Sequence, residues 1–237
     1  MNTKKVAIVT AASRGIGAGC ARELAARGYT VSLMARSEKV LDLASELGGI
    51  AIQGSITSYQ DLEKLVTTTI SRFHRLDAVV NSFGDPSRPD LLEIDDEMWQ
   101  ENFDMLFMSV VRIARLVTKP MQQAGGGAIV NISACDSQEP DLATPFSGTL
   151  RAAMEGFTKL YAKRYRSDLI RMVSIAPFFV ADSMEELAGW NVPDNLMFDR
   201  PVTYAELAKV VAFLLSDDAK FITGTTIKVD EAFSAAI

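Results

Sequence analysis

The sequence contains few of the side chains that hold small secreted proteins or metal centres together. Its 237 residues include two cysteines and one histidine, which argues against a disulfide framework and predicts no metal site. The two thiols, Cys20 and Cys135, indicate a reducing, cytoplasmic location. His74 lies in a polar stretch between a predicted helix and a predicted strand, so we expect it in an exposed loop. A Ser-His-Asp triad would depend on this single histidine.

Excess basic charge and long apolar runs are also missing. The chain has 24 basic and 30 acidic residues and a net charge of −6, which argues against a nucleic-acid partner. No apolar run approaches the ~20 residues of a membrane-spanning helix, and the first five residues lead into a strand rather than a signal peptide. No linker, repeat or low-complexity stretch divides the sequence, so a single domain is predicted over residues 1–237.

Strand-like and helix-like segments alternate along the whole chain. Beyond an N-terminal strand that ends before Thr10, nearly all-apolar strands are predicted at 30–35, 50–53, 76–81, 128–132, 170–175 and 225–229. Such strands, separated by helices, indicate a parallel sheet that is covered on both faces. The predicted fold is therefore a three-layer α/β/α doubly wound domain of about seven strands. Its ligands should bind beyond the carboxyl ends of the strands, where the strand order reverses.

Capping residues mark the predicted helices. Helices are predicted to begin after Ser37, after Ser58, at Asp95 and Asp96, near residue 149, and after Thr203. Ser58 with Asp61, and Thr203 with Glu206, have the spacing of a capping box. Residues 177–201 are irregular and rich in bulky apolar side chains. A segment of this kind after a C-terminal strand is typical of a substrate lid, although it could equally be a cover over the core.

The organising stretch is the tight turn between the first strand and the first helix. Unpaired N–H groups at a helix N-terminus favour a phosphate, and glycines allow close approach. The candidate phosphate-binding residues are Thr10, Ser13, Arg14, Gly15, Ile16 and Gly17. The alternative is an ordinary helix entry that binds nothing.

Several segments in order resemble the short-chain dehydrogenase/reductase family over essentially the whole chain. They are Thr10-Ala-Ala-Ser-Arg-Gly-Ile-Gly17, Asn81-Ser-Phe-Gly84, Ile129-Val-Asn-Ile-Ser-Ala134, Pro177, and the run from Phe213 to Gly224. Within the family, the chain is most similar to β-ketoacyl-carrier-protein-reductase-like proteins, and to a divergent subgroup of them that lacks the usual catalytic residues. The resemblance implies a nicotinamide dinucleotide cofactor, with Asn81 and Pro177 among its contacts.

Charge after the second strand indicates which dinucleotide. Ala35-Arg36-Ser37 offers no carboxylate for a ribose 2′-hydroxyl, whereas Arg36 and Arg14 can pair with a 2′-phosphate. NADP(H) is therefore the predicted cofactor, with Ser37 nearby. Ser55 stands where many relatives have an adenine-contacting Asp, so the adenine is expected to be held loosely. The alternatives are that both arginines are merely solvated and that no cofactor binds.

The catalytic positions depart from the family pattern. The resemblance implies an Asn, a Ser, a Tyr and a Lys; these positions fall on Leu106, Ala134, Ser147 and Arg151. A Ser hydroxyl is a far weaker acid than a phenol, and a guanidinium does not release its proton. Loss of acid–base help alone costs a factor of about 10²–10⁴ in rate.

Three functions follow as hypotheses. The first is a catalytically impaired subunit of an oxidoreductase assembly, a homo- or hetero-oligomeric dimer or tetramer with a related chain. The second is an active NADP(H) oxidoreductase that acts on a ketone or 3-oxoacyl-type substrate with a non-standard proton donor. The third is a non-redox enzyme in which Arg151 and Ser147 bind a carbonyl or carboxylate ligand. Cys135 is more simply a buried thiol than a nucleophile, and Asp136, Glu139 and Asp141 are expected to be solvated.

Overall fold

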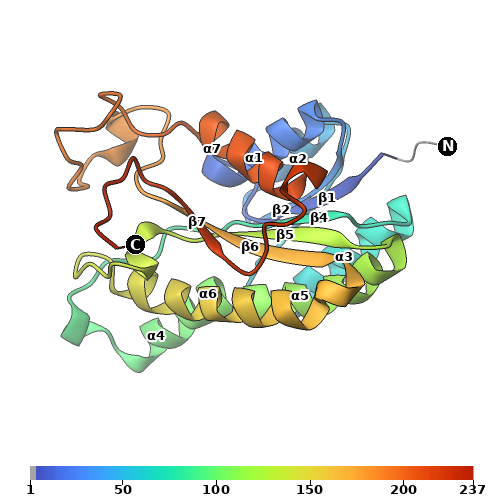
Figure 1. Cartoon of the computed structure of the whole chain (residues 1–237), viewed down its shortest axis with the longest axis horizontal. Coiled ribbons are helices and arrows are strands. Elements are labelled where there is room, and N and C mark those ends of the chain that lie inside the picture. Colours follow the sequence, from blue (N-terminus) through green and yellow to red (C-terminus); the bar gives the residue numbers. More distant parts are fainter. Residues whose placement is uncertain (1–3, 237) are drawn as a thin grey trace.

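Seven parallel strands form one sheet in the structure, a computed structural model that describes residues 4–236 (Figure 1). The strands are β1 (Val6–Val9), β2 (Thr30–Ala35), β3 (Ile50–Gln53), β4 (Ala78–Asn81), β5 (Gly127–Ile132), β6 (Ile170–Pro177) and β7 (Thr226–Val229). Their order is β3-β2-β1-β4-β5-β6-β7. The predicted doubly wound α/β fold is confirmed.

Helices cover both faces of the sheet (Figure 1). One face carries α1 (Gly15–Ala26), α2 (Lys39–Glu46) and α7 (Tyr204–Leu215), and the other carries α3 (Tyr59–Phe73), α5 (Ser109–Ala124) and α6 (Pro145–Tyr165). Each layer buries its own apolar cluster against the strands: Leu24 and Val211 belong to the first cluster, and Leu65 and Val117 to the second. Burial on both sides explains why the strands are apolar throughout.

The strand order reverses between β1 and β4. Hydrogen bonds join the ends of these two strands: the Thr10 hydroxyl donates to the Ser82 carbonyl at 2.8 Å and accepts from the Ser82 N–H at 3.0 Å. The turn before α1 and the loop after β4 therefore leave the sheet side by side. This is the position where a doubly wound fold binds its ligands.

Two predicted helices differ in detail. The long helix expected from Asp95 consists of α4 (Asp96–Phe103), a π-helical turn (Asp104–Met108) and α5. The helix expected near residue 149 begins at Pro145, because proline lacks only an N–H that the first turn leaves unpaired anyway.

Three predicted caps have different outcomes. Ser37 does not cap α2, whose N-cap residue is Glu38 and which has no side-chain cap. The capping box of Thr203 and Glu206 is confirmed. The Ser58 hydroxyl caps α3, but the Asp61 carboxylate accepts from the Ser55 N–H instead of completing a box.

The stretch predicted to be irregular, 177–201, is irregular except for Pro177, which ends β6, and its segment 178–200 follows that strand. It extends beyond the carboxyl ends of the strands, at the upper left of Figure 1, and holds one short 3-10 turn, Glu185–Leu187. A single parallel bridge between Val180 and Val202 closes it at its base. His74 is exposed at the end of α3, also as predicted. Within residues 4–236, no helix has the length and apolarity needed to cross a membrane.

The glycine turn contains an alanine in a left-handed conformation. Ala11 has a φ of 48°, which brings its Cβ close to its own carbonyl oxygen and costs about 1–2 kcal/mol in a residue other than glycine. The opposite constraint applies to Gly17: a Cβ there would lie 2.5 Å from the Ala11 carbonyl oxygen. The backbone path of the turn therefore excludes any side chain at residue 17. It accommodates the methyl group of Ala11 only in a strained conformation.

We expect Ala11→Gly to raise the free energy of unfolding by about 0.5–1 kcal/mol, because the relief of strain exceeds the extra entropy that glycine gives the unfolded chain. Urea denaturation would measure this. The matched control is Ala12→Gly, since Ala12 is fully buried and is not among the left-handed residues. This control should lose about 1 kcal/mol. Equal losses in both variants would show that Ala11 is not strained.

Candidate functional site

The N-terminus of α1 lies at the strand-order reversal and has no side-chain cap. Its N-cap residue, Arg14, forms no capping hydrogen bond, and the first turn contains no acidic residue. The first N–H groups of a helix have no partner within the helix, so those of α1 are available to an anion. Ser13, Gly15 and Ile16 are all partly accessible in this turn.

Two predicted cofactor residues use their side chains elsewhere. The Thr10 hydroxyl is occupied by Ser82. The buried Asn81 amide donates to the Asn131 side chain at 2.7 Å, and the Asn131 amide in turn donates to the Thr158 hydroxyl. These hydrogen bonds tie neighbouring strands and α6 together.

The other predicted cofactor residues lie around the rim of the turn. Arg14, Arg36 and Ser37 are exposed. Neither arginine side chain pairs with another residue in the part of the chain that the structure describes. Ser55 is half-buried, with its hydroxyl 2.8 Å from that of Thr57, and Pro177 ends β6.

An apolar cluster occupies the region of the predicted catalytic positions. Leu106, in the π-helical turn, is fully buried in one apolar cluster with Phe146, and Phe83 packs against this cluster. Trp99 meets Phe146 edge to face, with ring centroids 4.9 Å apart. The side chains of Leu106 and Phe83 have no polar atom that could hold a water. The sequence contained a signal for Phe83, because a bulky residue stands inside the quoted segment Asn81-Ser-Phe-Gly84.

Arg151 is a buried cation with too few partners. Only 8 % of its surface is exposed; one amine donates to the Ile132 carbonyl, and Nε has no hydrogen-bond partner. The guanidinium carbon lies 5.5 Å from the centre of the Phe83 ring. Burial lowers the pKa of Arg151 to about 10, and the charges of Asp136, Asp85 and Glu155 oppose this. The charged form is therefore destabilised by folding.

The remaining predicted catalytic positions, Ser147 and Ala134, lie on α6 and after β5. Ser147 is buried one turn before Arg151 on α6, and no hydrogen bond joins the two side chains. Ala134 follows β5 and is the N-cap residue of the short 3-10 turn Cys135–Ser137. Its neighbour Ser133 donates to the Glu155 carboxylate at 2.6 Å.

Cys135 is a buried thiol, in agreement with the simpler interpretation. Its Sγ donates to the Ala176 carbonyl at 3.3 Å. Burial, and next the charges of Asp230 and Asp136, raise the pKa of the Cys135 thiol to about 12. A nucleophilic thiol needs a low pKa.

The acidic loop after β5 is not merely solvated, which corrects the prediction. The Glu139 carboxylate accepts from the N–H groups of Ala235 and Ala236, at 2.7 and 3.4 Å. Asp141 accepts from the Ala143 N–H at 2.8 Å. Glu139 therefore binds the backbone near the C-terminus. Residue spacing along the sequence does not predict a contact between such distant segments.

Three residues near the glycine turn were not predicted. Tyr204, the first residue of α7, places its ring over Gly15, where an added Cβ would lie 3.6 Å from ring carbon Cε1. The Tyr204 hydroxyl donates to Glu186 at 2.7 Å, and its backbone N–H donates to Asp182 at 3.1 Å. These contacts join the irregular segment to α7, and no local sequence pattern specifies them.

A second contact joins the irregular segment to the loop after β4. The Arg88 guanidinium lies over the Trp190 ring, 3.1 Å from its centre. Trp190 also meets Phe179 edge to face, at 5.8 Å. The segment 178–200 is thus attached on both sides of the strand-order reversal, as a lid would be.

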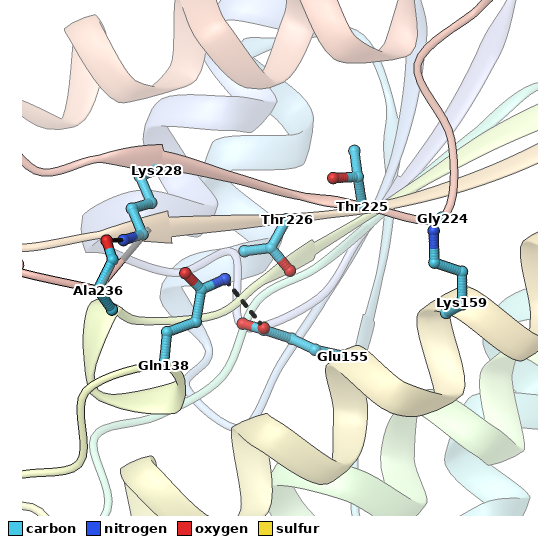
Figure 2. Close-up of a pocket in the computed structure, with 8 residues that line it drawn as sticks. All are labelled: Gln138, Glu155, Lys159, Gly224, Thr225, Thr226, Lys228 and Ala236. Carbon is cyan, nitrogen blue, oxygen red and sulfur yellow. Dashed lines mark hydrogen bonds between the residues drawn. The ribbon is translucent and has the colours of Figure 1, made fainter.

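A separate cavity of about 620 Å³ lies beside the edge strand β7 (Figure 2). Its lining is mostly polar: Gln138, Glu155, Lys159, Gly224, Thr225, Thr226, Lys228 and Ala236. The Glu155 carboxylate accepts from Gln138 and from the hydroxyl groups of Ser133 and Ser137. None of the lining residues belongs to the glycine turn. Among residues 4–236, no group of three or more His, Cys, Asp or Glu side chains could hold a metal ion.

The geometry agrees with comparisons to known proteins. Residues 10–234 match the family model described as enoyl-(acyl carrier protein) reductase. The chain is 32 % identical to a 3-oxoacyl-[acyl-carrier-protein] reductase of Synechocystis sp., across 96 % of both chains. It is 30 % identical to the dehydrogenase/reductase SDR family member 4 of Caenorhabditis elegans, across 94 % of this chain and 92 % of the other. Among solved structures, L-sorbose reductase of Gluconobacter frateurii, complexed with NADPH and L-sorbose, superposes with a TM-score of 0.90 and 26 % identity, across 99 % of this chain and 98 % of the other.

We expect Arg151→Met to stabilise the fold by about 1 kcal/mol. Folding lowers the pKa of this base from 12.5 to about 10, so the buried charge costs on the order of 3 kcal/mol at every pH below the folded-state pKa. The lost bond to the Ile132 carbonyl offsets about 1–2 kcal/mol of that gain. The midpoint of urea unfolding at neutral pH measures the change.

The control is Arg164→Met, which removes an exposed guanidinium from the same helix and should change stability by less than about 0.5 kcal/mol. A clear loss of stability in Arg151→Met alone would show that Arg151 supports the fold.

Proposed function

The chain belongs to the short-chain dehydrogenase/reductase family, and we propose that it binds NADP(H) but is catalytically impaired, as a subunit of an oxidoreductase assembly. The observation that carries the proposal is the contrast between the two ends of its cleft. The uncapped turn before α1 offers free N–H donors, whereas Leu106, Phe83 and Phe146 form an apolar cluster where the family relays protons.

The residues at the turn fit a dinucleotide. The uncapped helix start suits a pyrophosphate, and the absence of a carboxylate directly after β2 leaves Arg36 free to meet a 2′-phosphate. Ser13, Gly15 and Ile16 would contribute main-chain contacts, and Arg14 would add a second positive charge. When bound, the nicotinamide ring would supply the hydride of this family's chemistry. The solved relative bound to NADPH supports the same cofactor for this chain.

Loss of proton transfer is the reason to expect impairment. Neither Leu106 nor Ala134 has a hydroxyl or amide that could orient a substrate oxygen or a water. Ser147 is a poor acid, and Arg151 keeps its proton even with a pKa of about 10. The competing proposal is an active reductase of ketones or 3-oxoacyl-type substrates, which would need a proton donor outside these four positions.

A second candidate function rests on Arg151. Its buried, unpartnered Nε is an unused donor beside Ser147, and a guanidinium binds carboxylates well. A non-redox enzyme or binding protein for a small carbonyl or carboxylate compound would use this pair. The one amine that donates to the Ile132 carbonyl already fixes the orientation of the guanidinium.

We also propose that the chain associates with a copy of itself or with a related, catalytically complete chain in the cytoplasm. Large apolar side chains lie exposed, with Leu160 of α6 at 68 % and Phe221 at 91 % exposure. The outer edge of β7 is unpaired in the order of the sheet. Such features favour burial against another chain.

The proposal predicts NADPH binding without useful turnover. Fluorescence titration of the purified chain should show saturable NADPH binding. Reduction of a panel of ketones and 3-oxoacyl thioesters should be at least about 10³-fold slower than by a relative with the complete catalytic set. The protein must be free of any companion chain, and addition of such a chain is the control that shows the assay works. Reduction at an ordinary enzymatic rate would contradict the impairment.

The 2′-phosphate assignment predicts a selective effect of Arg36→Glu. Charge reversal should weaken NADPH binding by a factor of about 10–100 and leave NADH within about threefold, because only NADPH has the 2′-phosphate. Calorimetric titration with both dinucleotides measures this selectivity. Lys39→Glu, an equally exposed reversal in α2, serves as the control for general charge. Equal losses for both ligands would mean that Arg36 does not contact the 2′-phosphate.

A further inference from the structure

The glycine turn is bordered by carboxylates on its α7 side. The Tyr204 ring covers Gly15, and the Tyr204 hydroxyl donates to the Glu186 carboxylate at 2.7 Å. Asp182 accepts from the Tyr204 backbone N–H at 3.1 Å. Both carboxylates belong to the segment 178–200, so this lid segment brings negative charge to the edge of a turn whose own N–H groups favour an anion.

The same carboxylates act on the pKa of Tyr204. Burial raises the pKa of the Tyr204 hydroxyl, followed by its hydrogen bond to Glu186 and by the charges of Glu186, Asp182 and Asp85. Every charged group in this list is acidic. The charge of Asp85 also raises the pKa of the buried Arg151, against the effect of burial.

We propose that Tyr204 and Glu186 form a latch that holds a carboxylate beside the glycine turn and weakens dinucleotide binding while the lid segment is closed. The proposal rests on the function proposed above, in which the turn receives the pyrophosphate. A pyrophosphate brings two negative charges to the N–H donors of α1. A fixed carboxylate at the edge of that site opposes these charges, and Asp182 adds to the effect.

The latch makes affinity depend on the position of the lid. Glu186 lies in the 3-10 turn Glu185–Leu187, within a segment that is attached at its base by the Val180–Val202 bridge and across the cleft by the Arg88–Trp190 contact. Movement of that 3-10 turn away from α7 would increase the distance between the Glu186 carboxylate and the N–H donors of the glycine turn. A partner or substrate that displaces the lid segment would thus increase affinity for the dinucleotide.

The test is an NADPH titration of Glu186→Gln. Glutamine keeps the size of the side chain and can still accept from Tyr204, but it removes the charge. Binding should tighten by a factor of about 5 at low salt, with a smaller gain at high salt, because a unit charge near a partly exposed anion is screened by ions. Fluorescence and calorimetry report this change without any turnover.

Glu185→Gln is the matched control. Glu185 is the adjacent exposed carboxylate, and its hydrogen bonds go to Ser183 and to its own backbone rather than to Tyr204. The control makes the same change in net charge, but at a carboxylate that Tyr204 does not hold beside the turn. It should therefore shift the affinity for NADPH by less than a factor of about 2. Tyr204→Phe removes the hydroxyl that holds Glu186 and should also tighten binding. In combination with Glu186→Gln the gain should fall short of the product of the two single effects.

The outcomes separate the latch from the function on which it rests. Tighter binding in Glu186→Gln and Tyr204→Phe, with Glu185→Gln unchanged, supports the latch. If wild type and all three variants bind NADPH equally, the latch is overturned while dinucleotide binding stands. If none of them binds NADPH at millimolar concentration, both proposals fail. Unfolding curves of each variant verify that the proteins compared are folded.

Discussion

The close approach of Gly17 to the Ala11 carbonyl is the constraint on which the rest of the site depends. No side chain fits at 17, since its Cβ would lie 2.5 Å from that oxygen, and the chain can therefore turn sharply from β1 into α1. The sharp turn sets the uncapped start of α1 at the carboxyl end of β1, next to the loop that Thr10 holds through Ser82. Ala11 accepts a left-handed φ of 48° to keep this path. The strain is tolerable because the packed strands and α1 fix the backbone on both sides of it.

From this turn the cleft passes from one chemical environment to another. At the α1 end, free N–H donors favour an anion, although Asp182 and Glu186 stand at the border. At the α6 end, the buried side chains of Leu106 and Phe146 are apolar, and the buried Arg151 has an unpartnered Nε. Binding of a charged ligand and transfer of a proton make different demands, since the first needs only fixed charges and dipoles whereas the second needs a group with a pKa near the working pH. The uncapped turn before α1 suits the first demand, and the proposed impairment rests on the second.

The alternation of apolar strands and helices predicted the architecture, because a parallel sheet buried on both faces requires strands such as Val6–Val9 and Ala78–Asn81 to be apolar throughout. Local patterns likewise predicted the Thr203 capping box, whose partners lie three residues apart. What local patterns missed depends on contacts between distant segments. Glu139 holds residues near the C-terminus, and Tyr204 lies over Gly15, about 190 residues away along the chain. Ser37 failed as a cap because the turn that enters α2 makes Glu38 the N-cap residue instead.

The buried guanidinium of Arg151 determines which chemistry the α6 end of the site can support. A buried cation whose charge folding destabilises does not strengthen the fold, and its single bond to the Ile132 carbonyl recovers only part of the cost. Asp136, Asp85 and Glu155 reduce that cost, but none of them forms an ion pair with it in the part of the chain that the structure describes. The orphan Nε therefore remains a donor with unused capacity in a region of low dielectric, where a charged hydrogen bond is strong. An anionic group brought there would satisfy the guanidinium without any proton transfer, which is the basis of the binding role proposed for Arg151.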